Sequence, residues 1–269
     1  MDALATRLLA TVDAAYRTFA RYGPLRHLTL CLCNCCATPE DRQKLINTPL
    51  RQIPSALLAE YTNSAHGVPP DTDELKYFLP RYFELISDDD SPDHGPSAHV
   101  LQRLGDMIRA DPMALDPQER QVCADWMAAY IQCLIRSEGS GEDRVDCLTS
   151  CFETMFAAGF SADLVMAAYL SGFRQPGYGP KAAGAFAQGL MTSHVNYGRP
   201  LDLYALTSAA QSEKDQLVAL LTGQDWADLW QSLLTDAPVN GLDETERIMI
   251  RALAALSPEV WAANLMRHN

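Results

Sequence analysis

Apolar residues recur at helical spacing through almost the whole chain, and this periodicity most restricts its fold. Near the N-terminus, for example, Leu8, Val12 and Phe19 fall on one face of a helix with 3.6 residues per turn. No segment stands out with the alternating apolar and β-branched residues that are typical of a strand. The sequence therefore predicts an all-α fold, either an irregular multi-helix bundle or a stack of helical hairpins.

Capping residues locate the ends of the expected helices. Thr38 is the predicted N-cap of one helix, with Pro39 in its first turn, and Thr48-Pro49 ends that helix. Asp71, Asp73 and Glu74 place acidic groups at the start of the expected helix at 71–86. The apolar side chains that this helix is expected to bury are Leu75, Phe78, Leu79, Tyr82 and Phe83. The expected helices are 2–22, 38–48, 54–61, 71–86, 98–110, 117–137, 142–159, 161–173, 180–194, 201–209, 212–222, 225–235 and 242–255, with a short segment near 258–267.

A polar segment at 87–97 interrupts this pattern. It contains four aspartates together with proline and glycine, a composition that is typical of a solvated loop. The sequence predicts one all-α domain over residues 1–269, in which this acidic loop joins an N-terminal part, 1–86, to a helical part, 98–269. The four aspartates of the loop are Asp88, Asp89, Asp90 and Asp93.

The chain is acidic, with a formal net charge of −13. Residues 86–146 alone carry 13 acidic and five basic side chains. Such a surface repels phosphate backbones, so nucleic-acid binding is not expected. It would attract a protein with a basic surface and speed the encounter. An acidic excess that only keeps the protein soluble is the simpler alternative, and charge alone does not separate the two.

The sequence predicts a cytoplasmic protein without a membrane partner. No apolar run approaches the roughly 20 residues that span a bilayer. The first residues lack the basic leader and apolar core of a signal peptide. The oligomeric state does not follow from the sequence.

Four cysteines within six residues form a candidate zinc or thiol-redox site. A structural zinc site needs four ligands, usually as two pairs at short spacing. Cys33-x-x-Cys36 supplies one pair, and Cys147-x₃-Cys151 is the other candidate, but no sequence signal brings the pairs together. A redox CxxC motif would open a helix in a βαβ unit, which this chain lacks. The candidate metal ligands are Cys31, Cys33, Cys35 and Cys36.

The remaining cysteines and motifs indicate structure more than chemistry. Cys123, Cys133, Cys147 and Cys151 lie in apolar helical patterns and are expected in the core. Glycine-rich phosphate loops, a nucleophile elbow and an HExxH motif are all missing. The segment 172–180, which includes Tyr178, is either a binding loop or a connection between helices whose aromatic residues cover the core.

Five blocks in the first third of the chain form a recognisable combination: Cys33-x-x-Cys36, Thr38-Pro39-Glu40, Thr48-Pro49-Leu50-Arg51, Leu57-x₃-Tyr61-x₃-Ala65 and Asp73-Glu74-Leu75-Lys76-Tyr77-Phe78-Leu79-Pro80-Arg81-Tyr82-Phe83-Glu84-Leu85. Together they resemble a large family of uncharacterised bacterial proteins, which carries a short cysteine motif, a TPLR segment and an aspartate-led helix with the pattern FRYFLPR-x-LEL. The resemblance covers about residues 16–86. Lys76 stands where the family often has arginine, and four clustered cysteines stand where two are usual.

Some members of that family are encoded beside polymorphic toxins, so the resemblance implies an immunity protein that binds and neutralises a cognate toxin. The sequence therefore predicts a non-enzymatic, protein-binding module whose partner has a basic surface. The expected contacts are the loop aspartates Asp88, Asp89, Asp90 and Asp93, with Tyr178 as an aromatic anchor. The alternative is a zinc-binding or thiol-redox regulatory protein that uses the Cys31–Cys36 cluster.

Overall fold

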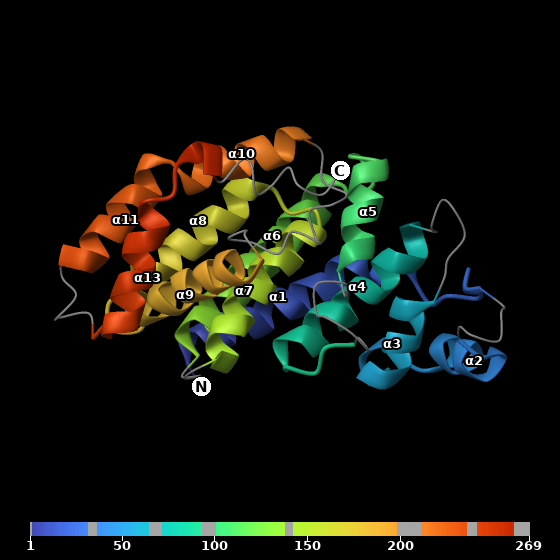
Figure 1. Cartoon of the computed structure of the whole chain (residues 1–269). Coiled ribbons are helices and arrows are strands. Elements are labelled where there is room, and N and C mark those ends of the chain that lie inside the picture. The colour runs from blue at the N-terminus through green and yellow to red at the C-terminus, as the bar shows by residue number, and fades with distance from the viewer. Residues whose placement is uncertain are drawn as a thin grey trace. The chain divides into compact units, whose positions relative to one another are not determined.

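The computed structural model describes residues 2–31, 37–64, 72–92, 101–137, 142–197, 211–235 and 241–260. Within these ranges the chain forms α-helices and two 3-10 turns and no β-strand, which confirms the predicted all-α class (Figure 1). In the same ranges, no helix combines the length and the apolar character needed to cross a bilayer. The α-helices are α1 (Ala3–Phe19), α2 (Pro39–Asn47), α3 (Ser55–Asn63), α4 (Thr72–Ser87), α5 (Gln102–Ala110), α6 (Pro117–Arg136), α7 (Glu142–Ala157), α8 (Ala162–Phe173), α9 (Gly179–Tyr197), α10 (Gln211–Leu221), α11 (Gln224–Thr235) and α13 (Glu244–Ala254), and the 3-10 turns are η1 (Ala20–Tyr22) and η2 (Leu50–Gln52).

The chain divides into two compact units, residues 1–130 (unit 1) and 131–269 (unit 2). The division falls inside α6, more than 30 residues beyond the acidic loop expected at 87–97.

Unit 1 is organised around α4, which packs along α1 and also contacts η1, η2 and α5. The side chain of Phe83 stacks on Trp126 of α6 with ring centroids 4.1 Å apart, and Phe78 lies 4.6 Å from Tyr61 of α3. A helix that contacts this many elements has little surface left for solvent. The apolar side chains predicted to be buried on this helix are all buried: Leu75, Phe78, Leu79, Tyr82 and Phe83.

Unit 2 is organised around α9, which packs on α7, α8 and α13 (Figure 1). Small residues allow this close approach: a Cβ atom at Gly184 would lie only 3.0 Å from Leu242 Cδ2, at the entry to α13. Phe186 of α9 is fully buried. Its ring joins a cluster with Phe152, Tyr169, Phe173 and Trp226.

Local signals located most helix ends to within a few residues. Thr38 caps α2 as predicted, with its hydroxyl accepting from the Asp41 N–H at 3.1 Å.

The segment 172–180 contains the short connection between α8 and α9. Tyr178 of this connection is half-buried, and Phe173 at the end of α8 is buried in the core. The helix expected at 201–209 lies outside the described residues.

The cysteines of the later helices do not all lie in the core. Cys123 and Cys151 are buried as predicted. Cys133 is only half-buried, and Cys147 is exposed, so the core assignment of Cys147 is wrong. Cys147 lies one helical turn before Cys151 on α7 and fits the same apolar spacing, but its own side chain is exposed.

Candidate functional site

Three predicted contact residues lie together on the turn that ends α4. Asp88, Asp89 and Asp90 are all exposed, as the sequence predicted. Their backbone N–H groups close the helix: Asp90 donates to Leu85 O at 2.9 Å and Asp89 to Ile86 O at 3.2 Å. This is the paired hydrogen bonding of a Schellman C-cap, so the three carboxylates are held on a defined turn rather than on a free chain.

This turn places its carboxylates where they are locally unfavourable. Asp89 has φ +58°, the left-handed conformation that glycine adopts more easily at this cap position. The carboxylates also surround the C-terminus of α4, the negative end of the helix dipole, where each acidic group costs about 0.3–1 kcal/mol. The result is a concentrated negative potential on an exposed, hydrogen-bonded turn.

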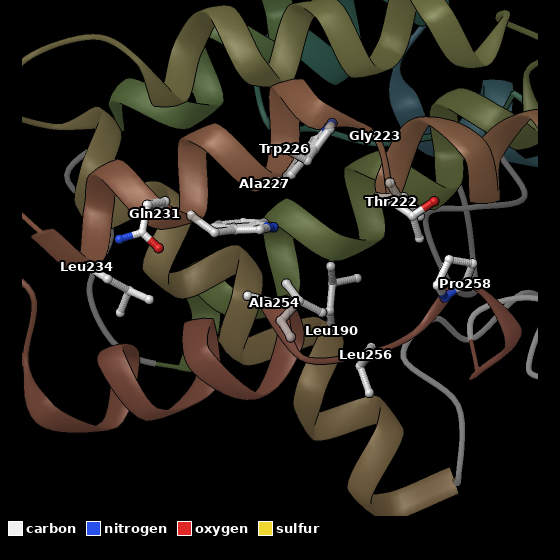
Figure 2. Close-up of a pocket in the computed structure, with 13 residues that line it drawn as sticks. Leu190, Thr222, Gly223, Trp226, Ala227, Gln231, Leu234, Ala254, Leu256 and Pro258 are labelled. Atoms are coloured by element: carbon white, nitrogen blue, oxygen red, sulfur yellow. The ribbon is translucent and has the colours of Figure 1, made fainter.

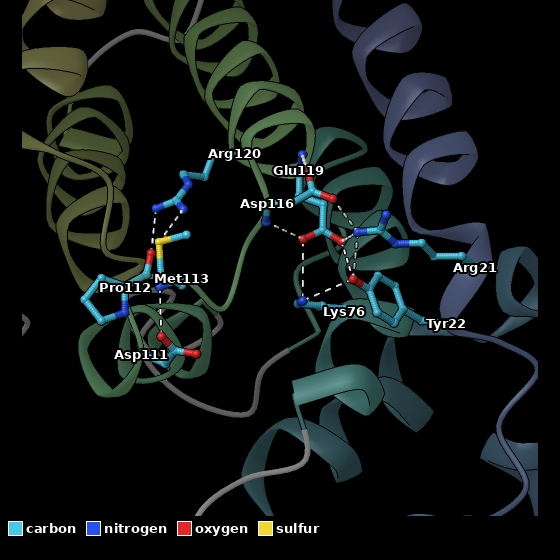
Figure 3. A network of polar contacts seen from close by, with 9 residues as sticks. All are labelled: Arg21, Tyr22, Lys76, Asp111, Pro112, Met113, Asp116, Glu119 and Arg120. Atoms are coloured by element: carbon cyan, nitrogen blue, oxygen red, sulfur yellow. Dashed lines mark hydrogen bonds and ion pairs between the residues drawn. The ribbon is translucent and has the colours of Figure 1, made fainter.

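A second polar feature of unit 1 is a buried network around Glu119 at the start of α6 (Figure 3). One oxygen of Glu119, Oε1, accepts hydrogen bonds from Arg21 Nη2 and from the Tyr22 hydroxyl. The other, Oε2, accepts from the Asp116 N–H at 2.9 Å and lies 3.4 Å from Lys76 Nζ. Asp116 Oδ1 accepts from the Glu119 N–H in return, so these two residues form a capping box. The network thus ties η1, α4 and α6 together.

The network keeps its acidic members ionised. Burial alone would raise the pKa of Glu119, but hydrogen bonds from Tyr22, from the Asp116 backbone and from Arg21, with the charge of Lys76, lower it below the ordinary value. Burial likewise opposes the charge of Lys76, yet the Tyr22 hydroxyl and Glu119 raise its pKa. Both oxygens of Glu119 already have two partners each. We therefore interpret this network as a structural anchor and not as a catalytic set.

The sequence does not predict this network. The one local signal was the spacing of Asp116 and Glu119, which fits a capping box. Nothing in the sequence connects that pair with Lys76, 40 residues earlier on another helix.

A third polar cluster holds the segment that leads into the cysteine motif. The N–H and hydroxyl of Thr29 donate to Oε2 of the buried Glu74, at 2.8 and 3.1 Å.

Arg103 of α5 caps the end of α3: it donates to the carbonyl of Thr62 at 2.6 Å and also to the carbonyl of Ser64. Its guanidinium lies 5.0 Å from the centre of the Tyr61 ring. A cation at the C-terminus of α3 complements the helix dipole there.

The candidate metal ligands fall mostly outside the described residues. Cys31 is half-buried in unit 1, whereas Cys33, Cys35 and Cys36 are not described. In the ranges that the structure covers, no three His, Cys, Asp or Glu side chains group as metal ligands would. The zinc-binding or thiol-redox alternative remains a prediction.

Two further contact residues were predicted, Asp93 and Tyr178. Asp93 lies outside the described residues. Tyr178 belongs to unit 2, where Arg136 of α6 lies over its ring at 5.9 Å from the ring centre. An arginine on its face already occupies part of the aromatic surface that a partner would contact.

Comparison with known proteins found no matching family model, no matching curated protein and no matching solved structure. The family resemblance of residues 16–86 therefore rests on the sequence pattern alone.

Proposed function

We propose that this protein is a non-enzymatic binding protein that recognises a basic surface on another protein through Asp88, Asp89 and Asp90. The observation that carries the proposal is the exposure of three carboxylates on the hydrogen-bonded turn at the C-terminus of α4. In line with the resemblance, the partner is a cognate bacterial toxin, and the protein acts as its immunity protein.

The local electrostatics favour a cationic partner at this turn. A Lys or Arg side chain placed there would interact with the carboxylates and with the negative end of the α4 dipole at the same time. Its positive charge would thereby offset the repulsion among the three carboxylates, and between them and the helix dipole, in the unbound protein. Because the turn is closed by backbone hydrogen bonds, the carboxylates can meet the partner without first being ordered, which lowers the entropic cost of binding.

The overall charge supports the same partner class. The net charge of −13 attracts a basic protein over a distance and raises the association rate. Salt weakens this attraction, because charges are screened beyond about 10 Å at 0.1 M ionic strength.

An inhibitor that only covers the partner's active site needs no catalytic residues of its own. The Glu119 network is consistent with this because both oxygens of its central carboxylate already have partners.

The proposal is tested with the product of the neighbouring gene. The two proteins are co-expressed, growth is recorded, and the association rate of the purified pair is measured at low and high salt. Replacing Asp88, Asp89 and Asp90 by asparagine should lower the association rate about tenfold at low salt and flatten its salt dependence.

A matched control variant replaces three other exposed aspartates, Asp106, Asp125 and Asp228, by asparagine. It removes the same net charge from other helices, so its association rate should stay within about twofold of wild type if the turn is the contact. If co-expression neither rescues growth nor yields a complex, the immunity role is wrong. If both variants slow association equally, the acidic turn is not the binding site.

A further inference from the structure

Unit 2 contains a pocket of about 290 Å³ (Figure 2). Its walls come from α9, α10, α11 and the end of α13 with the residues that follow. The side chains of Trp226 and Trp230 in its wall are buried, and none of its lining residues carries a formal charge. The pocket therefore points to no particular ligand.

Met113, in the loop between α5 and α6 of unit 1, is an exposed and reactive side chain. With 74 % of its surface accessible, it is the most exposed of the large apolar side chains in the described ranges. Met249 is half-buried. Five further methionines in those ranges are buried: Met107, Met127, Met155, Met166 and Met191. A reagent in solution therefore reaches Met113 more readily than the other described methionines.

Hydrogen bonds hold Met113 within this loop (Figure 3). The Met113 N–H donates to Asp111 Oδ1 at 2.9 Å, and the Ala114 N–H donates to Asp111 O at the same distance. Arg120 of α6 donates from Nη1 to Pro112 O at 2.6 Å. Its second terminal nitrogen, Nη2, donates to Met113 Sδ at 3.7 Å. The guanidinium is thus anchored to the loop and lies directly beside the sulfur.

Oxidation of the sulfur would strengthen its contact with Arg120. A thioether sulfur is a weak hydrogen-bond acceptor. A sulfoxide oxygen is a much stronger one, and a guanidinium N–H donates to it in a charge-assisted hydrogen bond. In a packed core the same oxidation would place a polar group among apolar neighbours and disrupt their packing. The loop between α5 and α6 is therefore a position at which the fold tolerates a methionine sulfoxide.

We propose that Met113 is a site of reversible oxidation to the sulfoxide, and that Arg120 binds the new oxygen. Hydrogen peroxide supplies this atom: the S–O bond forms as the O–O bond breaks, the sulfur loses two electrons, and the peroxide leaves as water. A methionine sulfoxide reductase reverses the change by oxidising two thiols to a disulfide and releasing water. The site shares no residue with the acidic turn at 88–90, so it is independent of partner binding there.

The oxidation itself is measured residue by residue. The full-length protein is treated with hydrogen peroxide at neutral pH, and peptide mapping by mass spectrometry quantifies the sulfoxide at each methionine over time. Met113 should oxidise at least about tenfold faster than Met107 and Met127, because these two are buried. Unfolding in guanidinium chloride should equalise the three rates. Incubation of the oxidised, folded protein with both stereospecific sulfoxide reductases should restore the thioether of Met113.

The role of Arg120 is tested by NMR of the arginine side chains. The guanidinium N–H signals of Arg120 are assigned with an Arg120→Lys variant. On oxidation they should move downfield and exchange with water at least about threefold more slowly, because an N–H gains a stronger acceptor. Met113→Leu is the matched control: it keeps the volume of the side chain but has no sulfur, so peroxide should leave the Arg120 signals unchanged.

Three outcomes would overturn the proposal. Oxidation of Met107 or Met127 as fast as that of Met113 in the folded protein would mean that exposure does not select the site. Failure of both reductases to repair Met113 would make the oxidation a permanent lesion and not a reversible change. Arg120 signals that do not respond to oxidation, or that respond equally in Met113→Leu, would remove Arg120 from the site.

Discussion

The ammonium group of Lys76 on α4 lies 3.4 Å from the carboxylate of Glu119 on α6, and both side chains are buried in unit 1. A buried charge is tolerated only when its partners replace the water it has lost. Glu119 finds that replacement in Arg21, Tyr22 and the Asp116 N–H. Removing the carboxylate therefore affects several groups at once.

We expect Glu119→Ala to lower the free energy of unfolding by about 3–5 kcal/mol, because it leaves Lys76 as an uncompensated buried charge. Urea unfolding measures the change. Asp106→Ala is the matched control, since Asp106 is exposed and its ion pair with Arg109 at i,i+3 contributes under about 1 kcal/mol. Equal effects of the two substitutions would mean that the buried network does not stabilise unit 1.

The pH dependence of stability follows from the direction of the Glu119 shift. Its pKa is lowered from 4.5 in the folded protein, so the stabilisation is complete above the unfolded pKa and is lost as pH falls through the folded pKa. The difference in unfolding free energy between wild type and Glu119→Gln should therefore shrink as pH drops below about 4.5. If the difference in unfolding free energy between wild type and Glu119→Gln stays constant below about pH 4.5, the pKa of Glu119 is not lowered in the folded protein.

Asp89→Gly should stabilise the protein while weakening partner binding. Glycine adopts the positive φ of this cap without strain, and the substitution removes one charge from the negative end of the α4 dipole. We expect a gain of about 1 kcal/mol in unfolding free energy. Asp88→Asn is the control that removes a charge without changing the left-handed position. A loss of stability in Asp89→Gly would mean that the carboxylate makes a favourable contact.

Gly179→Ala should destabilise unit 2, because a Cβ atom at this position would lie 2.5 Å from Phe173 O and 2.6 Å from Gly172 O. Both contacts are with backbone atoms at the end of α8, which cannot turn aside as a side chain can. We expect a loss of about 1–3 kcal/mol, measured by urea unfolding. Gln175→Ala, an exposed change in the same connection, should stay within about 0.5 kcal/mol of wild type.

The thiols of α6 and α7 should differ in reactivity. Burial raises the pKa of Cys151 to about 12 and also raises that of Cys123, so almost no thiolate is present at neutral pH. Iodoacetamide should modify exposed Cys147 in the folded protein, and the other two at least about 100-fold more slowly. Peptide mapping by mass spectrometry measures the rates, and unfolding in urea should equalise them. Fast labelling of folded Cys151 would contradict its burial.

Much of unit 1 could be predicted because apolar spacing is a local property. The five core side chains expected on the 71–86 helix, including Leu75 and Phe83, are buried in α4. The same helix also buries Glu74 and Lys76, which no spacing rule predicts, since charged residues are exposed by default. Their burial depends on partners that arrive from other elements, such as Thr29 and Glu119.

The acidic turn was predicted only in part. Composition indicated that Asp88, Asp89 and Asp90 are solvent-exposed, and they are. The C-cap that they form was not predicted, because glycine is the usual residue at a left-handed cap and none stands there. The pocket of unit 2 had no sequence signal at all: its walls are contributed by four helices whose apolar residues are indistinguishable in sequence from ordinary core.

The sequence by itself determined the helices, most of their ends and the acidic character of the chain. Each of these depends on residues within a few positions of one another: a 3.6-residue period, a capping side chain, a run of like charges. The tertiary structure alone decided the division into two units within α6, the burial of Lys76 against Glu119, and the pocket beside Trp226. These features arise where residues far apart in the chain meet, and the energies that hold them, desolvation and packing, exist only once the helices are in contact.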